Sequence, residues 1–291
     1  MEIQNISDTY EYSARYSVIL CDLWGVIHNG EKIHKHSQDF LEKVKNDGKK
    51  IILISNAPRP NFTVEEQLRN KLGLSSDLYD YVVTSGDITA MQLNKKNTEK
   101  NYYHIGPDKD KDLLSIIELS QKKEIYSSDF ILCTGINDDL SDPNNGPVES
   151  ANDYLKILEE IHKLKLEMVC ANPDKIVYRG DTKIDCAGAV ALKYEKMGGK
   201  VKYFGKPHIE IYEHILTELN KDEPEIEKKD LLAIGDSFST DILGANNFNI
   251  DALFIKSGIH HKEINETNDI NVIAKRYLST LPAKLITSNN L

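Results

Sequence analysis

Polar side chains that could bind a phosphate and a metal ion stand where short apolar runs of this chain end. They are Asp22, Ser55 with Asn56, Lys206, and Asp236 with Asp241. Taken singly, each is as well explained by a helix cap or a turn. An acid at the end of a buried strand is unusual, however, because an unpaired carboxylate loses its hydration there. Together the residues predict one site at the edge of a sheet.

The residue types of this set suit phosphoryl transfer. Parallel strands would deliver Asp22, Ser55 and Asp236 to one edge, where open α/β sheets bind ligands. Carboxylates gathered there repel each other unless a cation neutralises them, and oxygen ligands without His or Cys favour Mg²⁺. Lys206 and the Ser55 hydroxyl, with the amides that follow it, supply positive potential for an anion such as phosphate. A carboxylate nucleophile could then form an aspartyl-phosphate, because this chemistry needs mainly positioning and charge neutralisation.

Strand-like and helix-like segments alternate along the chain, which is typical of a mostly parallel sheet covered by helices. We expect strands over residues 18–23, 50–55, 81–84, 102–105, 130–133, 167–170, 202–204, 231–234 and 252–255. We expect helices over residues 37–47, 63–72, 150–164, 187–197, 209–219 and 240–246, and a loop over 137–147. The residues that suggest chemistry fall before about position 60 and after about position 200. The fold class is therefore α/β: a doubly wound parallel-sheet core of residues 1–86 and 201–291, with an α/β domain of residues 87–200 inserted into it.

The four polar segments resemble, in order and approximate spacing, the four motifs of the haloacid dehalogenase (HAD) superfamily. The resemblance implies that Asp22 is the nucleophile and that Lys206 pairs with the nucleophile and the phosphate. Ser55 and the Asn56 amide would contact the phosphoryl oxygens.

The same resemblance implies a Mg²⁺ ion at the site. Asp22, the backbone carbonyl of Trp24 and Asp236 would hold it, and Asp241 would act through the outer shell or through water.

The long insert between the second and third motifs is similar to that of the class IIA members, the group of NagD, the 4-nitrophenylphosphatases and the pyridoxal phosphatases. The segment 84–87 resembles the group's entry into the cap, and Asn172-Pro173-Asp174 resembles its cap motif. By that resemblance the insert is a substrate-selecting cap, and Asn172, Asp174 and the loop 181–185 face the leaving group. A structural turn and helix cap explains these residues equally well.

Trp24 departs from the family pattern, because the family phosphatases carry an Asp two residues after the nucleophile. An indole N–H donates a hydrogen bond but cannot shuttle a proton at physiological pH. General acid–base help is typically worth about 10²–10⁴-fold, so a phosphatase without it should be slow. His28, His34 or Asp174 could supply the proton instead.

The predicted activity is therefore Mg²⁺-dependent hydrolysis of small phosphomonoesters, such as sugar phosphates or nucleotides. Two alternatives stay open. One is a phosphometabolite-binding protein with little turnover. The other is a dehalogenase, since the dehalogenases of the superfamily also carry an aromatic residue where Trp24 stands; the large insert and the intact metal acids weigh against it.

Composition restricts the partners. The net charge of −10 argues against nucleic acid and anionic membranes. Cys21, Cys133, Cys170 and Cys186 form no C-x-x-C pair and are expected to be buried thiols. No signal-peptide core opens the chain and no apolar run reaches membrane-spanning length, so we expect a cytoplasmic protein whose partner is a small phosphorylated metabolite. Capped relatives often dimerise through the cap, which leaves a homodimer as an expectation.

Five of the histidines are expected to lie on the surface. His28, His34 and His36 stand on a polar loop, and the pair 260–261 follows the last predicted strand. Their spacing provides no convincing set of zinc ligands.

Overall fold

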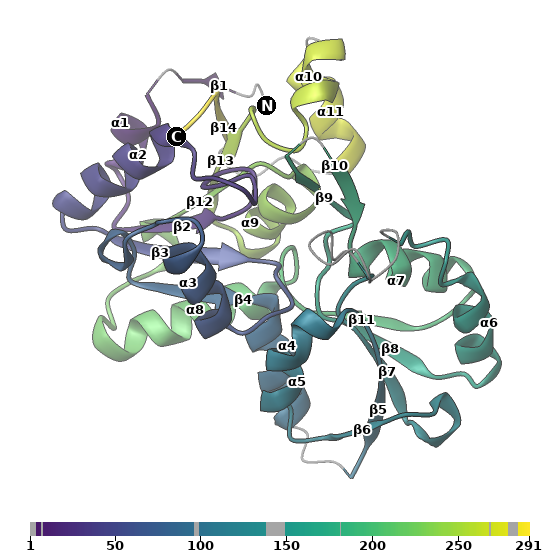
Figure 1. Cartoon of the computed structure of the whole chain (residues 1–291). Coiled ribbons are helices and arrows are strands. Elements are labelled where there is room, and N and C mark those ends of the chain that lie inside the picture. The colour runs from purple at the N-terminus through teal and green to yellow at the C-terminus, as the bar shows by residue number, and fades with distance from the viewer. Residues whose placement is uncertain are drawn as a thin grey trace. The chain divides into compact units, whose positions relative to one another are not determined.

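The computed structural model describes residues 4–6, 8–95, 99–137, 149–180, 182–267, 269–278 and 285–291. Its internal contacts divide the chain into two compact units (Figure 1). The first comprises Met1–Ser55, Val64–Val83 and Lys206–Leu291, and the second comprises Asn56–Thr63 and Thr84–Gly205. The chain therefore leaves the first unit and returns to it.

A seven-stranded sheet forms the centre of the first unit, in the order β1-β14-β13-β12-β2-β3-β4. Its strands are β1 (Gln4–Asn5), β2 (Val18–Asp22), β3 (Lys50–Ser55), β4 (Tyr81–Thr84), β12 (Leu231–Gly235), β13 (Asp251–Ile255) and β14 (Leu285–Ser288). The first six strands in this order, β1, β14, β13, β12, β2 and β3, are each parallel to their neighbours. The order runs outward from β2 to β4 on one side and from β12 to β14 on the other. It therefore reverses between β2 and β12, and open α/β sheets bind ligands at the carboxyl ends of the strands at such a point.

The helices that lie in the first unit, or overlap it, are α1 (Thr9–Ser13), α2 (Lys35–Asn46), α3 (Asn61–Asn70), α8 (Ile209–Asp222), α9 (Leu243–Phe248), α10 (His261–Thr267) and α11 (Ile270–Tyr277). Helix α2 illustrates why they form: its buried Phe40, Leu41 and Val44 recur at helical spacing and face the core. Gly48, at φ +73°, then ends the helix in the left-handed conformation that glycine adopts at little cost.

The second unit contains a smaller doubly wound sheet, in the order β6-β5-β7-β8-β11. Its strands are β5 (Asn101–Ile105), β6 (Ser120–Lys122), β7 (Phe130–Cys133), β8 (Glu167–Cys170) and β11 (Val201–Tyr203). Its helices are α4 (Ser85–Asn94), α5 (Lys111–Ile116), α6 (Leu155–Lys163) and α7 (Ala187–Lys196). All neighbouring strands of this sheet are parallel.

The two faces of the smaller sheet carry different helices. Helices α4 and α5 lie on one face and α6 and α7 on the other (Figure 1). Under α6 and α7, Ile131 and Met168 join a buried cluster with Leu158 and Val190. All four cysteines of the chain are free and buried, which confirms their prediction as buried thiols.

Helix α4 begins with a reciprocal cap in the segment that resembled the class IIA entry into the cap. The Asp87 amide donates to Thr84 Oγ1 at 3.0 Å, and the Thr84 amide donates to Asp87 Oδ2 at 2.9 Å. Two amides that a helix start leaves without intrahelical partners are thereby satisfied. The Thr-Ser-Gly-Asp sequence is thus explained by its role in capping the start of helix α4.

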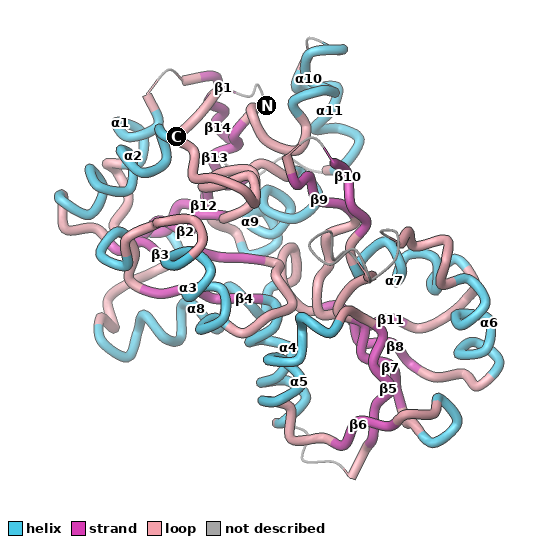
Figure 2. The backbone as a smooth tube through the Cα atoms, in the orientation of Figure 1, coloured by secondary structure: helices cyan, strands magenta, loops and turns pink. Residues whose placement is uncertain are grey.

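Several expected segments differ from the structure. The expected loop 181–185 forms β10 (Thr182–Asp185), which pairs antiparallel with β9 (Ile176–Arg179) as a hairpin (Figure 2); Asp181 lies outside the described residues. The helix expected from residue 150 begins at Leu155. The helix expected over 240–246 is a π-helix, Phe238–Ile242, continued by α9. Apart from residue 137, the expected loop 137–147 lies outside the described residues. Over the described part of the chain, no helix is long and apolar enough to cross a bilayer.

Candidate active site

The candidate site lies at the carboxyl ends of β2 and β12, where the strand order of the first unit reverses. Asp22 is the last residue of β2, a strand that is buried along its whole length. Asp236 follows directly after β12, which is equally buried. The register pairs Ile234 with Cys21, so Asp22 and Asp236 leave neighbouring strands at nearly the same level. The apolar strands thus anchor two acids at one edge.

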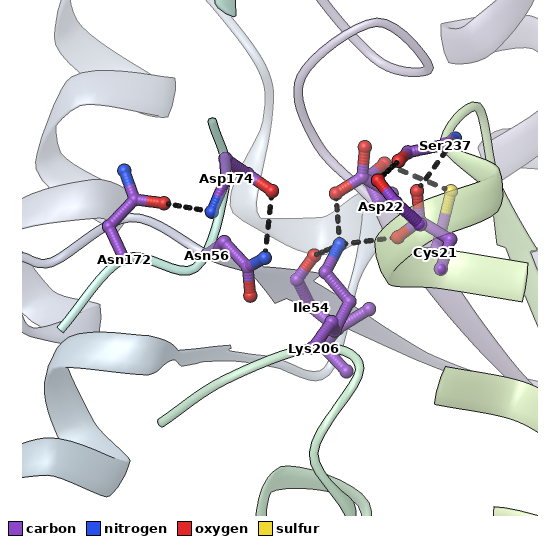
Figure 3. A network of polar contacts seen from close by, with 10 residues as sticks. Cys21, Asp22, Ile54, Asn56, Asn172, Asp174, Lys206 and Ser237 are labelled. Carbon is purple, nitrogen blue, oxygen red and sulfur yellow. Dashed lines mark hydrogen bonds and ion pairs between the residues drawn. The ribbon is translucent and has the colours of Figure 1, made fainter. Parts of the chain in front are cut away.

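Lys206 links three parts of this edge through its ammonium group. It forms an ion pair with Asp22 and a second with Asp241 Oδ1 at 2.6 Å, and it donates to the Ile54 carbonyl at 3.2 Å (Figure 3). The side chain is only 3% exposed, so these contacts must replace the hydration that the ammonium loses.

Three buried carboxylates gather at this edge of the sheet. Asp22, Asp236 and Asp241 each offer an oxygen within 4.8 Å of the others. Burial raises the pKa of the Asp22 carboxyl well above its usual range, and the charges of Asp241 and Asp236 raise it further, while Lys206 opposes the rise. One ammonium does not balance three carboxylates, so the cluster favours an additional cation. A compact set of oxygen ligands fits Mg²⁺.

The Asp236 carboxylate accepts a hydrogen bond from the backbone and is closely approached by two glycines. The Ile259 amide donates to its Oδ2 at 2.7 Å. A Cβ atom added to Gly25 or to Gly258 would stand 2.0 Å from the same oxygen, so both positions require glycine. Gly25 also has φ +87°, which glycine adopts readily.

The loop of Gly258 and Ile259 was not among the predicted site residues. The signal that could have found it is its position: it follows β13, the neighbour of β12, at the same edge of the sheet.

Asp241 connects the lysine to the start of the π-helix. Its Oδ1 pairs with Lys206, and its Oδ2 accepts a hydrogen bond from the Ser237 amide at 3.0 Å. A Cβ on Gly235 would stand 2.2 Å from the Asp241 Cβ, so this glycine lets the acid approach the strand end.

Trp24 is half-buried, and its indole is held by the turn that follows it. Its ring lies edge-on to the His28 ring, with centroids 5.1 Å apart, and a Cβ on Gly30 would stand 2.4 Å from the indole Cζ2. The Gly30 amide donates to His28 Nδ1 at 3.0 Å. The prediction of His28 as a surface residue is wrong: it is 4% exposed because it packs under this turn.

His260 is likewise buried, at 6% exposure, and its prediction as an exposed residue is wrong. The Phe238 amide donates to its Nε2 at 3.3 Å, and its Nδ1 lies 2.6 Å from Glu263 Oε2. Burial lowers its pKa. His260 therefore supports the first residue of the π-helix that carries Asp241.

The residues expected to bind phosphate and substrate fall into both units. Ser55 is buried at the carboxyl end of β3 in the first unit. Asn56 follows it and belongs to the second unit, where its Nδ2 donates to Asp174 Oδ1 at 2.9 Å. The Asp174 amide donates to Asn172 Oδ1 at 3.0 Å (Figure 3). The structure thus joins Asp22, Lys206, Asp236 and Asp241 in one cluster, and Asn56, Asn172 and Asp174 in another.

Two models of known families match separate parts of the chain. The model described as haloacid dehalogenase-like hydrolase matches residues 19–119, and the model described as HAD-hydrolase-like matches residues 203–279. A 4-nitrophenylphosphatase of Schizosaccharomyces pombe is 24% identical over 94% of this chain and 95% of that protein.

Solved structures share the whole architecture. A haloacid dehalogenase-like hydrolase from Brucella suis 1330 is 32% identical, with a TM-score of 0.84 over 98% of this chain and 99% of that one. NagD from Escherichia coli K-12 is 18% identical, with a TM-score of 0.65 over 94% and 97%, which confirms the predicted NagD-like fold. From these matches, and from the doubly wound sheet they share, the chain belongs to the haloacid dehalogenase-like hydrolase family.

Proposed function

We propose that this chain is a Mg²⁺-dependent phosphatase that hydrolyses small phosphomonoesters through an aspartyl-phosphate on Asp22. The observation that carries the proposal is the buried cluster in which Lys206 bridges Asp22 and Asp241 beside Asp236. The similarity to a 4-nitrophenylphosphatase supports the same class of reaction.

In the proposed first step, a carboxylate oxygen of Asp22 attacks phosphorus as the bond to the ester oxygen breaks. Ser55, the Asn56 amide and Lys206 would stabilise the charge on the remaining phosphoryl oxygens. Asp22, Asp236 and the Trp24 carbonyl would hold Mg²⁺, with Asp241 orienting its waters, and the cation supplies the neutralisation that lets an oxyanion approach three acids.

In the second step, water attacks the phosphorus, inorganic phosphate leaves, and the Asp22 carboxylate is restored. Trp24 can neither protonate the departing oxygen nor deprotonate this water. We propose that the leaving group takes its proton from solvent or from His34 or Asp174, so that turnover is slow and favours esters with stable leaving groups.

We propose that the second unit acts as the cap that selects the substrate. The Asn56–Asp174–Asn172 hydrogen bonds support this role, because they hold two side chains of the predicted cap motif in defined positions. The four reduced, buried cysteines fit a reducing compartment such as the cytoplasm.

The proposal is tested by measuring phosphate release from a panel of sugar phosphates, nucleotides and 4-nitrophenyl phosphate, each with Mg²⁺ or with a chelator. We expect Mg²⁺-dependent turnover in the wild type and none in Asp22→Asn, with the fold of the variant retained by circular dichroism.

Other results would replace this function. Saturable binding without phosphate release across the panel would make the protein a phosphometabolite binder. Halide release from a 2-haloacid in the presence of chelator would make it a dehalogenase.

A further inference from the structure

A cavity of about 300 Å³ opens in the second unit. It lies against the smaller sheet: Phe130, Glu167 and Lys200 line it near the starts of β7, β8 and β11, and Phe204 lines it directly after the end of β11. Asn172 and Asp174, which follow the carboxyl end of β8, are not among its lining residues. The cavity is therefore lined by other residues than those proposed to select the phosphatase substrate.

The floor of this cavity is apolar. Phe130, Val169 and Phe204 line it from the strands or their ends, and Leu93 lines it from α4. Alternate residues of a strand point to opposite faces, so these side chains share the α4 face, whereas Ile131 and Met168 pack into the cluster under α6 and α7. Strand β11 stands at the edge of the sheet.

The rim of the cavity is basic. Four lysines line it: Lys100, Lys165, Lys200 and Lys202. The two acids of the lining are Asp129 and Glu167, and Asp129 Oδ2 already accepts a hydrogen bond from the Asn101 amide at 2.7 Å. The lining thus carries formally two more positive than negative charges, in a chain whose net charge is −10.

The lysines of the rim are not engaged by neighbouring acids. Among the described residues, none of their four ammonium groups forms an ion pair or a hydrogen bond. Lys202 Nζ instead lies 4.8 Å from the centre of the Phe204 ring, above the floor. Like charges held close together repel each other, and an anion between them would relieve that repulsion.

We propose that this lysine-rimmed cavity binds a small organic anion that carries at least two negative charges next to an apolar ring. Its volume is at the lower end of small-ligand pockets, which span roughly 300–1,000 Å³. Lysines can bind phosphate, sulfonate or carboxylate groups as point charges. An inorganic anion would make no contact with the apolar floor, and a neutral ring would leave the lysine charges of the rim without a counter-charge. The site is distinct from the proposed phosphatase centre.

The test is calorimetric titration of the full chain with naphthalene-1,5-disulfonate, a ring with two charges and no phosphoryl group. We expect saturable binding to one site in the wild type and in Asp22→Asn. The double variant Lys165→Glu/Lys200→Glu should weaken it at least tenfold. The control Lys163→Glu/Lys196→Glu makes the same charge change at exposed lysines outside the cavity and should bind as the wild type does. Sulfate alone and 2-naphthol alone should each bind at least tenfold more weakly than the disulfonate.

The proposal is overturned if the disulfonate shows no saturable binding, or if both double variants weaken it equally. It is also overturned if the rim variant changes only a monomer–dimer equilibrium in sedimentation, because the face would then bind a second copy of the chain. Phosphatase activity of the rim variant is measured alongside, so failure of this site and failure of the proposed function are separate results.

Discussion

At the scale of the residue, Trp24 is the side chain on which the proposed slow turnover depends. The indole packs against the backbone of Gly30 and against the His28 ring, so its position is fixed by the turn that follows it. His28 is occupied in the same turn, since its Nδ1 accepts from the Gly30 amide. Trp24 is thus a packed aromatic side chain at the position where the resemblance predicts an acid.

Trp24→Asp should restore an acid–base group and raise the rate of phosphate release by about 100-fold, within the range of general acid–base catalysis. Trp24→Asn removes the same packing without a titrating group and should bring no such gain. The most sensitive comparison is steady-state kinetics with an alkyl phosphate, because its alkoxide is a poor leaving group. Equal rates for the two variants would show that the lost acid is not what limits turnover.

Gly258 offers a second prediction at this scale, because it leaves no room for a side chain beside Asp236. Gly258→Ala would place a Cβ 2.0 Å from Oδ2, so the carboxylate or the loop must move. We expect roughly a hundredfold loss of turnover, the size associated with misplacing a reacting group by about 1 Å. Gly135→Ala, whose Cβ would meet only atoms at 3.5 Å or beyond, is the matched control and should leave turnover unchanged.

At the scale of the element, apolar runs predicted the buried strands well. The bounds of β3, β4, β7 and β8 agree with the expected ranges because these strands are largely buried and are ended by turns or helix caps. The hairpin of β9 and β10 was missed because its residues, apart from Ile184, are half-buried or exposed, and its strands lack the apolar run of a central strand. Strand β1 was missed because it has two residues and depends on pairing with β14, at the far end of the chain.

The sequence could reveal those site residues that stand at the ends of apolar strands. Acids that end apolar strands, such as Asp22, can be recognised from local pattern. The burial of His28 and His260 could not, because it depends on turns and rings brought from elsewhere, as when Phe238 and Tyr277 pack around His260.

His104 gives a prediction for the contact between β5 and β7. Its Nε2 lies 2.9 Å from Thr134 Oγ1, and burial lowers its pKa to about 4. The unfolded chain takes up a proton near pH 6.5, so stability should be complete above that pH and fall as the pH drops toward 4, by up to about 3 kcal/mol. His104→Gln should flatten this fall in denaturant unfolding, whereas His162→Gln, at an exposed histidine, should not. Parallel pH profiles for wild type and His104→Gln would contradict the assignment.

At the scale of the whole molecule, each of the two units carries one of the proposed sites on its own sheet. The first sheet reverses between β2 and β12 and gathers the acids there, while the lysine-rimmed cavity lies against the second sheet. The sequence suggested an insertion because the candidate site residues of the first unit lie before about residue 60 and after about residue 200. It could not suggest the cavity, whose lysines are spread from Lys100 to Lys202 and meet only in the folded sheet.

Mg²⁺ should stabilise the folded chain, because it would bind the acid cluster only when β2 and β12 are paired. At a concentration about 100-fold above the dissociation constant, the gain is about 2.7 kcal/mol, or roughly 5 °C in melting temperature. Asp236→Asn should lose this shift, and Asp129→Asn, an acid away from the cluster, should keep it. A shift that persists in Asp236→Asn would place the cation elsewhere.

The proposed mechanism requires that the carboxylate of residue 22 becomes phosphorylated during turnover. Because Trp24 cannot activate the second water, the acyl phosphate should accumulate and be available for trapping. We therefore expect acid quenching during turnover of 4-nitrophenyl phosphate, followed by borohydride reduction and peptide mass spectrometry, to find homoserine at position 22 and aspartate at positions 236 and 241. Turnover with unmodified Asp22, and with activity retained in Asp22→Asn, would contradict the account.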